Sequence, residues 1–94
     1  MKKPLIQVAL DFTDLDSALV ASKNIENYVD VIEAGTILIC AEGMQAVRTL
    51  KKLHPNHIIV CDIKTTDAGV VLAEMAFQAG ADWLTVCAAA HIAT

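Results

Sequence analysis

The sequence predicts an α/β fold in which parallel strands and helices alternate along one chain. Four short apolar runs alternate with stretches of helical periodicity. The strand ends at Asp11, Glu33, Asp62 and about Cys87 lie 22, 29 and 25 residues apart, close to the repeat of a compact βαβ unit. Hydrophobic residues make up 55% of the 94 residues but aromatic residues only 4%, a composition typical of parallel strands buried on both faces.

The first unit predicts a strand at 5–10 that ends at Asp11. The stretch 13–16 has the pattern of a capping box, which places Thr13 at a helix N-cap. In the helix that follows, three- and four-residue steps place the core-facing positions on one stripe: Leu15, Ala18, Leu19, Ser22 and Ile25.

The second unit predicts a strand at 30–34, which Gly35 breaks, and a helix from about 43 to 53. Lys51 and Lys52 lie in the last turn of this helix, where cations suit the helix dipole, and Pro55 prevents its continuation.

The third unit predicts a strand at 57–61 that ends near Asp62, and a helix at 68–79 with Gly80 as its C′ residue. A fourth strand is predicted at 83–88, and residues 89–94 stop where a fourth helix or loop would begin.

Four such units cannot close an eight-stranded barrel, which typically needs about 250 residues. The chain is therefore either about half of a TIM (β/α)8 barrel or a small open α/β sheet. We favour the half barrel because charged residues follow the predicted strands at their C-terminal ends, where the ligand sites of such barrels lie. Residues 1–94 are expected to form a single, incomplete domain that leaves sheet edges and an apolar face uncovered, and therefore associates.

Composition excludes several classes of protein. A net charge of −4 with a single arginine argues against nucleic-acid binding, which takes clustered Lys and Arg. Three widely spaced cysteines predict neither a disulfide framework nor a zinc site and favour a reducing cytoplasm. No apolar run approaches the ~18 residues of a membrane span, and Asp11 interrupts the first run too early for a secretory signal.

Carboxylates end three of the predicted strands, at Asp11, Glu33 and Asp62. Lys64 follows Asp62 by two residues, so strand alternation directs both side chains to the same side. In parallel α/β folds, ligands bind at the C-terminal strand ends. The alternative is that strands simply end where polar residues begin, but three carboxylates and one lysine together favour a site.

The segment 62–67 has the pattern D-x-K-x-x-D, formed by Asp62, Lys64 and Asp67. Asp67 directly precedes the third helix, so it is also a candidate N-cap, and the two roles are compatible.

These motifs resemble the 3-keto-L-gulonate-6-phosphate decarboxylases, which belong to the orotidine 5′-monophosphate decarboxylase suprafamily. The resemblance keeps motif order and spacing but covers only the first half of the family's barrel. The stretches that carry it are 7–11 (QVALD), 30–38 (DVIEAGTIL), 42–43 (EG), 62–69 (DIKTTDAG) and 81–86 (ADWLTV).

The resemblance implies Mg²⁺-dependent decarboxylation of 3-keto-L-gulonate 6-phosphate to L-xylulose 5-phosphate, a step of L-ascorbate catabolism. It implies that Glu33 and Asp62 are Mg²⁺ ligands and that Lys64 stands beside the enediolate left by loss of CO₂. Asp11 would hold Lys64 and the substrate hydroxyls. Asp67 would reach the neighbouring subunit's site, so the active unit would be a homodimer acting on a small sugar phosphate.

Two alternatives stay open. Orotidine monophosphate decarboxylases share D-x-K-x-x-D but have a lysine where Glu33 stands, which argues against that activity. The Mg²⁺-dependent aldolase 3-hexulose-6-phosphate synthase shares the carboxylates, although residues 35–38 and 81–83 resemble the decarboxylase more closely. A non-catalytic half-barrel remnant, which folds only by pairing, is the other alternative.

The family's later His and Arg and its phosphate loops have no counterpart before Thr94, so we expect this chain to be truncated and a weak catalyst alone. Residues without a predicted chemical role are the loop or helix-end histidines His54, His57 and His91, the core-filling cysteines Cys40, Cys61 and Cys87, the core methionines Met44 and Met75, and the structural Trp83.

Overall fold

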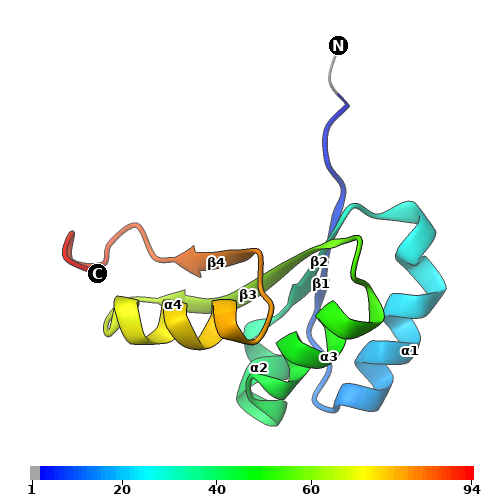
Figure 1. Cartoon of the computed structure of the whole chain (residues 1–94), viewed down its shortest axis with the longest axis horizontal. Helices are drawn as coiled ribbons and strands as arrows, with labels where there is room; N and C mark the ends of the chain where they lie inside the picture. The colour runs from blue at the N-terminus through cyan, green and yellow to red at the C-terminus, as the bar shows by residue number, and fades with distance from the viewer. Residues whose placement is uncertain (1–2) are drawn as a thin grey trace.

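The computed structural model describes residues 3–94, and its elements are arranged around one four-stranded parallel sheet (Figure 1). The sheet has the strand order β1-β2-β3-β4, with every neighbouring pair parallel. This sequential parallel order is the one predicted for half of a (β/α)8 barrel. The strands are β1 (Gln7–Leu10), β2 (Val31–Ala34), β3 (Ile58–Thr65) and β4 (Trp83–Val86), and the helices are α1 (Leu15–Ile25), the 3₁₀ helix η1 (Glu26–Tyr28), α2 (Thr36–Glu42), α3 (Gln45–Leu53) and α4 (Gly69–Gln78).

The core lies between the helices and one face of the sheet. Strand residues that pair across β1, β2 and β3 point to the same side, and those on the helix side are buried: Leu10, Ile32, Ala34, Ile59 and Cys61. Helices α1 and α3 contribute Ala18, Val47 and Leu50 to the same cluster. The alternate positions of the strands therefore face away from the helices, where they are free to carry polar groups.

Helix α1 begins one residue later than predicted. Asp14, and not Thr13, is its N-cap, because the Asp14 carboxylate accepts hydrogen bonds from the Ser17 amide at 2.7 Å and from the Ser17 hydroxyl at 2.9 Å. The prediction of Thr13 was wrong by one position, although the stripe it preceded is confirmed, since Ala18 and Ser22 are fully buried.

A helix that the sequence analysis missed, α2, follows β2 directly. Gly35 does end the strand, but it also serves as the N-cap of α2 in an extended conformation without any capping side chain. Gly43 ends α2 at φ +68° and donates its amide to Ile39 O at 2.7 Å. The predicted helix at about 43–53 corresponds to α3 alone.

Strand β3 is longer than predicted, because it continues past Asp62 to Thr65. Its pairing with β4 changes register between Cys61 and Thr65, and Lys64 lies within this irregular stretch at φ +48°. The C-terminal half of β3 is therefore bent, as is common next to functional sites.

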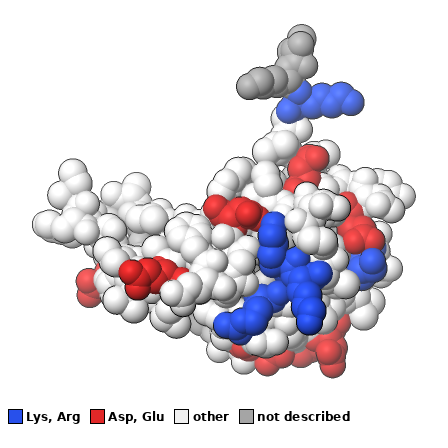
Figure 2. All heavy atoms as spheres, viewed as in Figure 1, with Lys and Arg blue, Asp and Glu red and all other residues white. Residues whose placement is uncertain are grey.

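Helix α4 matches the predicted 68–79 closely, and Gly80 at φ +107° confirms the predicted C′ residue. The N-cap is Ala68 at φ +55°, so Asp67 is not the N-cap. Met75 was expected in the core but is 47% exposed, because this part of α4 has no element packed over it in residues 3–94. The end of the molecule formed by α4 and β4 carries few charges (Figure 2).

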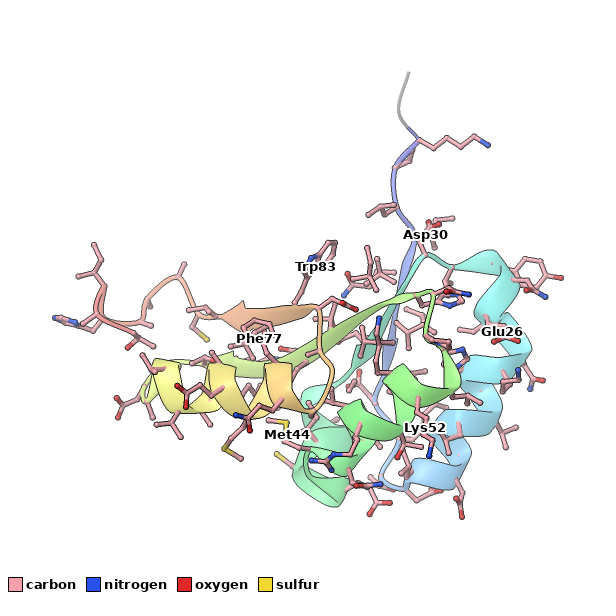
Figure 3. All side chains as sticks on the ribbon, in the orientation of Figure 1. Glu26, Asp30, Met44, Lys52, Phe77 and Trp83 are labelled. Atoms are coloured by element: carbon pink, nitrogen blue, oxygen red, sulfur yellow. The ribbon has the colours of Figure 1, made fainter. Side chains whose placement is uncertain are left out.

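No helix within residues 3–94 is long and apolar enough to cross a membrane. Trp83 opens β4 as predicted; it is 46% exposed and projects from the strand away from α4 (Figure 3).

Candidate functional site

The three predicted carboxylates come from three neighbouring strands. Asp11 directly follows β1, Glu33 lies in β2, and Asp62 lies in β3. The register pairs Glu33 with Ala9 on one side and with Val60 on the other. These positions alternate with the buried core residues, so the site occupies the sheet face opposite the helices.

Glu33 is half-buried between two other acids. Its Oε1 accepts a hydrogen bond from Gln7 Nε2 at 2.8 Å. Burial raises the pKa of Glu33, and repulsion from Asp62 and Asp11 adds to the increase. These carboxylates are therefore close enough to repel one another, and a cation between them would relieve that repulsion.

Asp62 and Lys64 form an ion pair in which Nζ lies 2.8 Å from Oδ2. Burial would raise the pKa of Asp62, but hydrogen bonds from Lys64 and Thr85 outweigh it and hold that pKa below its usual value. The hydrogen bond to Asp62 raises the pKa of Lys64. The pair therefore presents a fixed ammonium, 61% exposed, beside an ionised carboxylate at neutral pH.

Two threonines that the sequence analysis missed complete this cluster. Thr36, the first residue of α2, and Thr85, in β4, both hydrogen-bond Asp62 and Lys64. The local pattern held one clue to Thr85, a polar residue between the apolar Leu84 and Val86 on the predicted fourth strand. Only the register between β3 and β4 shows that Thr85 lies against Asp62 and Lys64.

Asp11 is exposed and lies at the start of the loop after β1. Its carboxylate is directly against Gly35, the residue that links β2 to α2. The Gly35 amide donates to Leu10 O at 3.0 Å, so the ends of β1 and β2 are joined at this point. Asp11 therefore shares the C-terminal edge of the sheet with Glu33.

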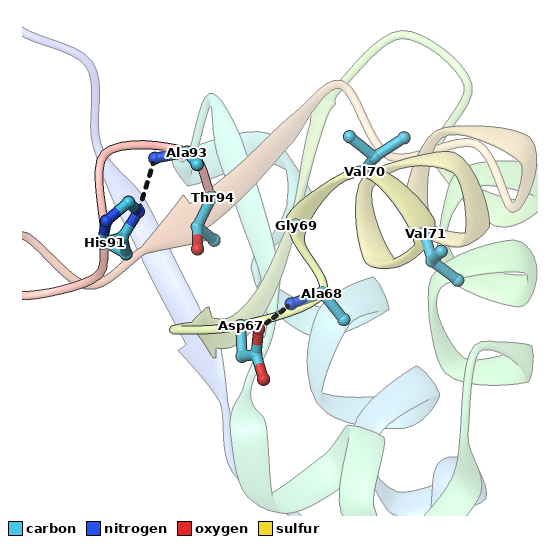
Figure 4. Close-up of a pocket in the computed structure, with 8 residues that line it drawn as sticks. All are labelled: Asp67, Ala68, Gly69, Val70, Val71, His91, Ala93 and Thr94. Carbon is cyan, nitrogen blue, oxygen red and sulfur yellow. Dashed lines mark hydrogen bonds between the residues drawn. The ribbon is translucent and has the colours of Figure 1, made fainter.

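Asp67 lies apart from these residues. Its Oδ1 accepts a hydrogen bond from the Ala68 amide at 2.8 Å, and it lines an open hollow of about 390 Å³ together with His91 and Thr94 (Figure 4). None of Asp11, Glu33, Asp62 or Lys64 lines this hollow. The exposed Asp67 thus lines a part of the surface that none of these four residues lines.

The carboxylates of Glu33 and Asp62, on the neighbouring strands β2 and β3, suit a hard divalent cation. Residues 3–94 contain no group of three or more His, Cys, Asp or Glu side chains arranged to hold a metal ion. Mg²⁺, however, is commonly held by only one or two carboxylates with water and substrate oxygens as the other ligands. Glu33 and Asp62, which supply oxygen donors and repel each other, fit that requirement.

A second polar cluster joins α1, η1 and α3. His54, at the end of α3, is 1% exposed; its Nε2 lies 2.7 Å from Ser22 Oγ and its Nδ1 lies 3.0 Å from Glu26 Oε2. This connectivity is that of a Ser-His-acid triad. Ser22, however, is fully buried and donates its hydroxyl proton to Leu19 O at 2.8 Å, so it cannot act as a nucleophile.

The remaining histidines and cysteines have mostly structural positions. His57 Nε2 lies 2.8 Å from Glu26 O, and His91 lies in the C-terminal loop. Cys61 is a core residue as expected, and burial raises the pKa of its thiol to about 11. Cys40 is exposed on α2, so its expected place in the core was wrong, and Cys87 is half-buried.

Comparison with known proteins places these residues in a described family. Residues 4–94 match the family described as "Orotidine 5'-phosphate decarboxylase / HUMPS family". Over all 94 residues the chain is 66% identical to a probable 3-keto-L-gulonate-6-phosphate decarboxylase of Haemophilus influenzae and 49% identical to 3-keto-L-gulonate-6-phosphate decarboxylase UlaD of Escherichia coli. It spans 42% and 44% of the lengths of these two relatives.

Solved structures show the same relationship. A 3-keto-L-gulonate-6-phosphate decarboxylase of Vibrio cholerae superimposes with a TM-score of 0.96 at 64% identity, over 98% of this chain and 43% of that one. A 3-hexulose-6-phosphate synthase superimposes with a TM-score of 0.92 at 44% identity, over 94% of this chain and 42% of that one. The four strands and the helices described above thus match less than half of each solved chain.

Proposed function

The chain belongs to the orotidine 5′-phosphate decarboxylase / HUMPS family, and on that premise we propose that it supplies the acidic strand ends of a Mg²⁺-dependent sugar-acid phosphate decarboxylase. The substrate would be 3-keto-L-gulonate 6-phosphate and the product L-xylulose 5-phosphate, a step of L-ascorbate catabolism in the cytoplasm. The observation that carries the proposal is that Glu33 and the Asp62–Lys64 ion pair share one edge of the sheet.

In the proposed reaction the bond between the carboxylate carbon and its neighbour breaks, CO₂ leaves, and the electron pair remains as an enediolate that later takes up a proton. The fixed Lys64 ammonium would lie beside the developing negative charge. Asp11, at the end of β1, would bond substrate hydroxyls, whereas the Lys64 ammonium, which Asp11 was expected to hold, bonds Asp62 and Thr36 instead. Glu33 and Asp62 would hold Mg²⁺, which would supply Lewis-acid stabilisation of negative charge that develops on substrate oxygens.

Asp67 supports a second part of the proposal, a homodimer. Its exposed carboxylate lines a hollow outside the cluster of its own chain. We infer that it reaches the site of a neighbouring subunit. Exposed apolar side chains on α4 and β4, among them Val70, Val71 and Trp83, are available for association.

The direct test is Mg²⁺-dependent release of CO₂ from 3-keto-L-gulonate 6-phosphate. The purified chain would be assayed alone and after mixing with a C-terminal half barrel from a relative, with EDTA as the control for metal dependence. Release in either preparation supports the proposal. Lack of release in both, from a chain whose fold is verified, would contradict it.

A second candidate is the 3-hexulose-6-phosphate synthase reaction, favoured by the TM-score of 0.92 to such an enzyme. Formaldehyde-dependent consumption of ribulose 5-phosphate would identify it. Lack of both activities, together with self-association, would instead favour the non-catalytic half-barrel module.

A further inference from the structure

Two threonine hydroxyls flank the Asp62–Lys64 ion pair, one from each neighbouring element. Thr36 Oγ1 donates to Asp62 O at 2.7 Å and accepts from Lys64 Nζ at 2.7 Å. Thr85 Oγ1 donates to Asp62 Oδ1 at 2.6 Å and accepts from the Lys64 amide at 3.0 Å. Each hydroxyl therefore bonds both residues of the pair, but through different atoms.

The direction of these four hydrogen bonds is fixed by the number of protons available. The Lys64 ammonium and amide can only donate, so each threonine oxygen accepts from Lys64. Each hydroxyl then has a single proton, which goes to an oxygen of Asp62. Removal of either hydroxyl would leave a Lys64 donor and an Asp62 acceptor without these partners.

The backbone of Lys64 needs such support because it adopts a left-handed conformation, with φ +48°, that residues with a side chain rarely adopt. The stretch lies in the register shift between β3 and β4. Thr85 in β4 and Cys87 just beyond it contact both backbone polar groups of Lys64. Thr85 Oγ1 accepts from the Lys64 amide, and Cys87 Sγ lies 3.4 Å from Lys64 O. Strained backbone of this kind persists where its surroundings hold it in place.

The two threonines act on different parts of Lys64. Thr36 bonds the end of a flexible side chain, whereas Thr85 bonds the backbone and so determines the direction in which that side chain leaves β3. Thr85 also orients the carboxylate of Asp62, a proposed metal ligand. Its hydroxyl thus holds the lysine backbone and the acid at the same time.

We propose that Thr85 is a positioning residue that aims Lys64 and Asp62 for the reaction. The effect on the reaction rests on the proposed function. The effect of Thr85 on the positions of Lys64 and Asp62 does not depend on it. Thr85 acts through its two neighbours and needs no contact with substrate.

The test uses three variants of the full chain. Thr85→Val removes the hydroxyl and keeps the shape, whereas Thr85→Ser keeps the hydroxyl. Thr65→Val is the matched control, because the Thr65 hydroxyl is buried and has no hydrogen-bond partner within the described residues. The first readout is the ¹H–¹⁵N signal and hydrogen-exchange rate of the Lys64 amide. The second is kcat and KM for CO₂ release, in whichever preparation of the wild type is active.

In Thr85→Val the Lys64 amide is expected to exchange at least about tenfold faster and its signal to move, with kcat reduced about 10- to 100-fold and KM changed much less. Thr85→Ser restores both readouts, and Thr65→Val matches the wild type. A Lys64 amide that is unchanged in Thr85→Val, or a Thr85→Ser variant that behaves like Thr85→Val, overturns the inference. A wild type that releases no CO₂ counts against the proposed function instead, since the amide readout still decides whether Thr85 holds Lys64.

Discussion

The Asp11 carboxylate occupies the space that a side chain at Gly35 would need. A Cβ at Gly35 would overlap Asp11 Oδ1 and would lie 2.8 Å from the Leu10 carbonyl oxygen. Gly35 itself has an ordinary extended conformation. It is therefore the close approach of the β1 end, and not backbone freedom, that requires glycine here.

We expect Gly35→Ala to displace Asp11 and to destabilise the chain by about 1–3 kcal/mol, the usual cost of overpacking. Urea unfolding measures this change. The same substitution in an Asp11→Ala background is the control, because the overlap with the carboxylate is then gone and the loss should be smaller. Equal losses in both backgrounds would show that Asp11 does not fill this space.

Glu33→Gln is expected to weaken Mg²⁺ binding about tenfold or more, because the variant loses a carboxylate donor. Isothermal titration with Mg²⁺ checks this prediction, with the exposed Glu74→Gln on α4 as the matched control. An unchanged Mg²⁺ titration would remove Glu33 from the proposed ligand pair.

Without divalent ions the Glu33→Gln variant should be more stable than the wild type at pH 7. Burial and repulsion raise the pKa of Glu33 in the folded chain, so its contribution to stability is present below its unfolded pKa and is lost as pH rises through the folded pKa. The amide of the variant does not ionise, so the variant has no such loss. Urea unfolding in EDTA at pH 4.5 and pH 7 measures the free energy of unfolding of both proteins. The difference between them should shift in favour of Glu33→Gln as pH rises.

Lys64→Ala should abolish turnover in any active preparation and leave folding nearly intact. The lysine side chain is 61% exposed, so loss of its ion pair with Asp62 should have little effect on the free energy of unfolding. Circular dichroism and urea unfolding report the fold, and CO₂ release reports turnover. Lys52→Ala, on the exposed face of α3 (Figure 3), should change neither. Full activity in Lys64→Ala would exclude the proposed role of this ammonium.

His54 should make the stability of the chain depend on pH. Burial lowers the pKa of His54, and Glu26 at 3.0 Å offsets only part of this effect, while His57 and Lys23 add to the lowering. A histidine with a depressed folded pKa contributes stability that is present above its unfolded pKa and is lost as pH falls through the folded pKa.

The wild type should therefore exceed His54→Asn in stability by about 1–3 kcal/mol at pH 7.5, the cost of disturbing buried hydrogen bonds, and by less at pH 5.5. Urea unfolding at the two pH values measures the gap. A stability difference between wild type and His54→Asn that is larger at pH 5.5 than at pH 7.5 would show that the folded chain raises the pKa of His54 instead of lowering it.

Local patterns in the chain were enough to predict the alternation of four strands and their helices, the placement of Asp11, Glu33 and Asp62 on or directly after three neighbouring strands, and the family resemblance, but not the extension of β3 past Asp62. These features follow from periodicity, from polar residues that end apolar runs, and from motif spacing. Short-range errors arose where two neighbouring residues could fill one role, as with Thr13 and Asp14. Helix α2 was missed because Gly35, a strand breaker in the sequence, is also its uncapped start.

The connections between the strand ends, in contrast, became visible only in the folded chain. The bonds from Thr36 and Thr85 to the Asp62–Lys64 pair cross between elements 21 to 28 residues apart, and they depend on the register shift in β3 and on the left-handed backbone of Lys64. The burial of His54 against Ser22, 32 residues away, has the same origin. Local patterns encode which residues form an element, whereas the register and approach of elements are fixed only when the whole sheet packs.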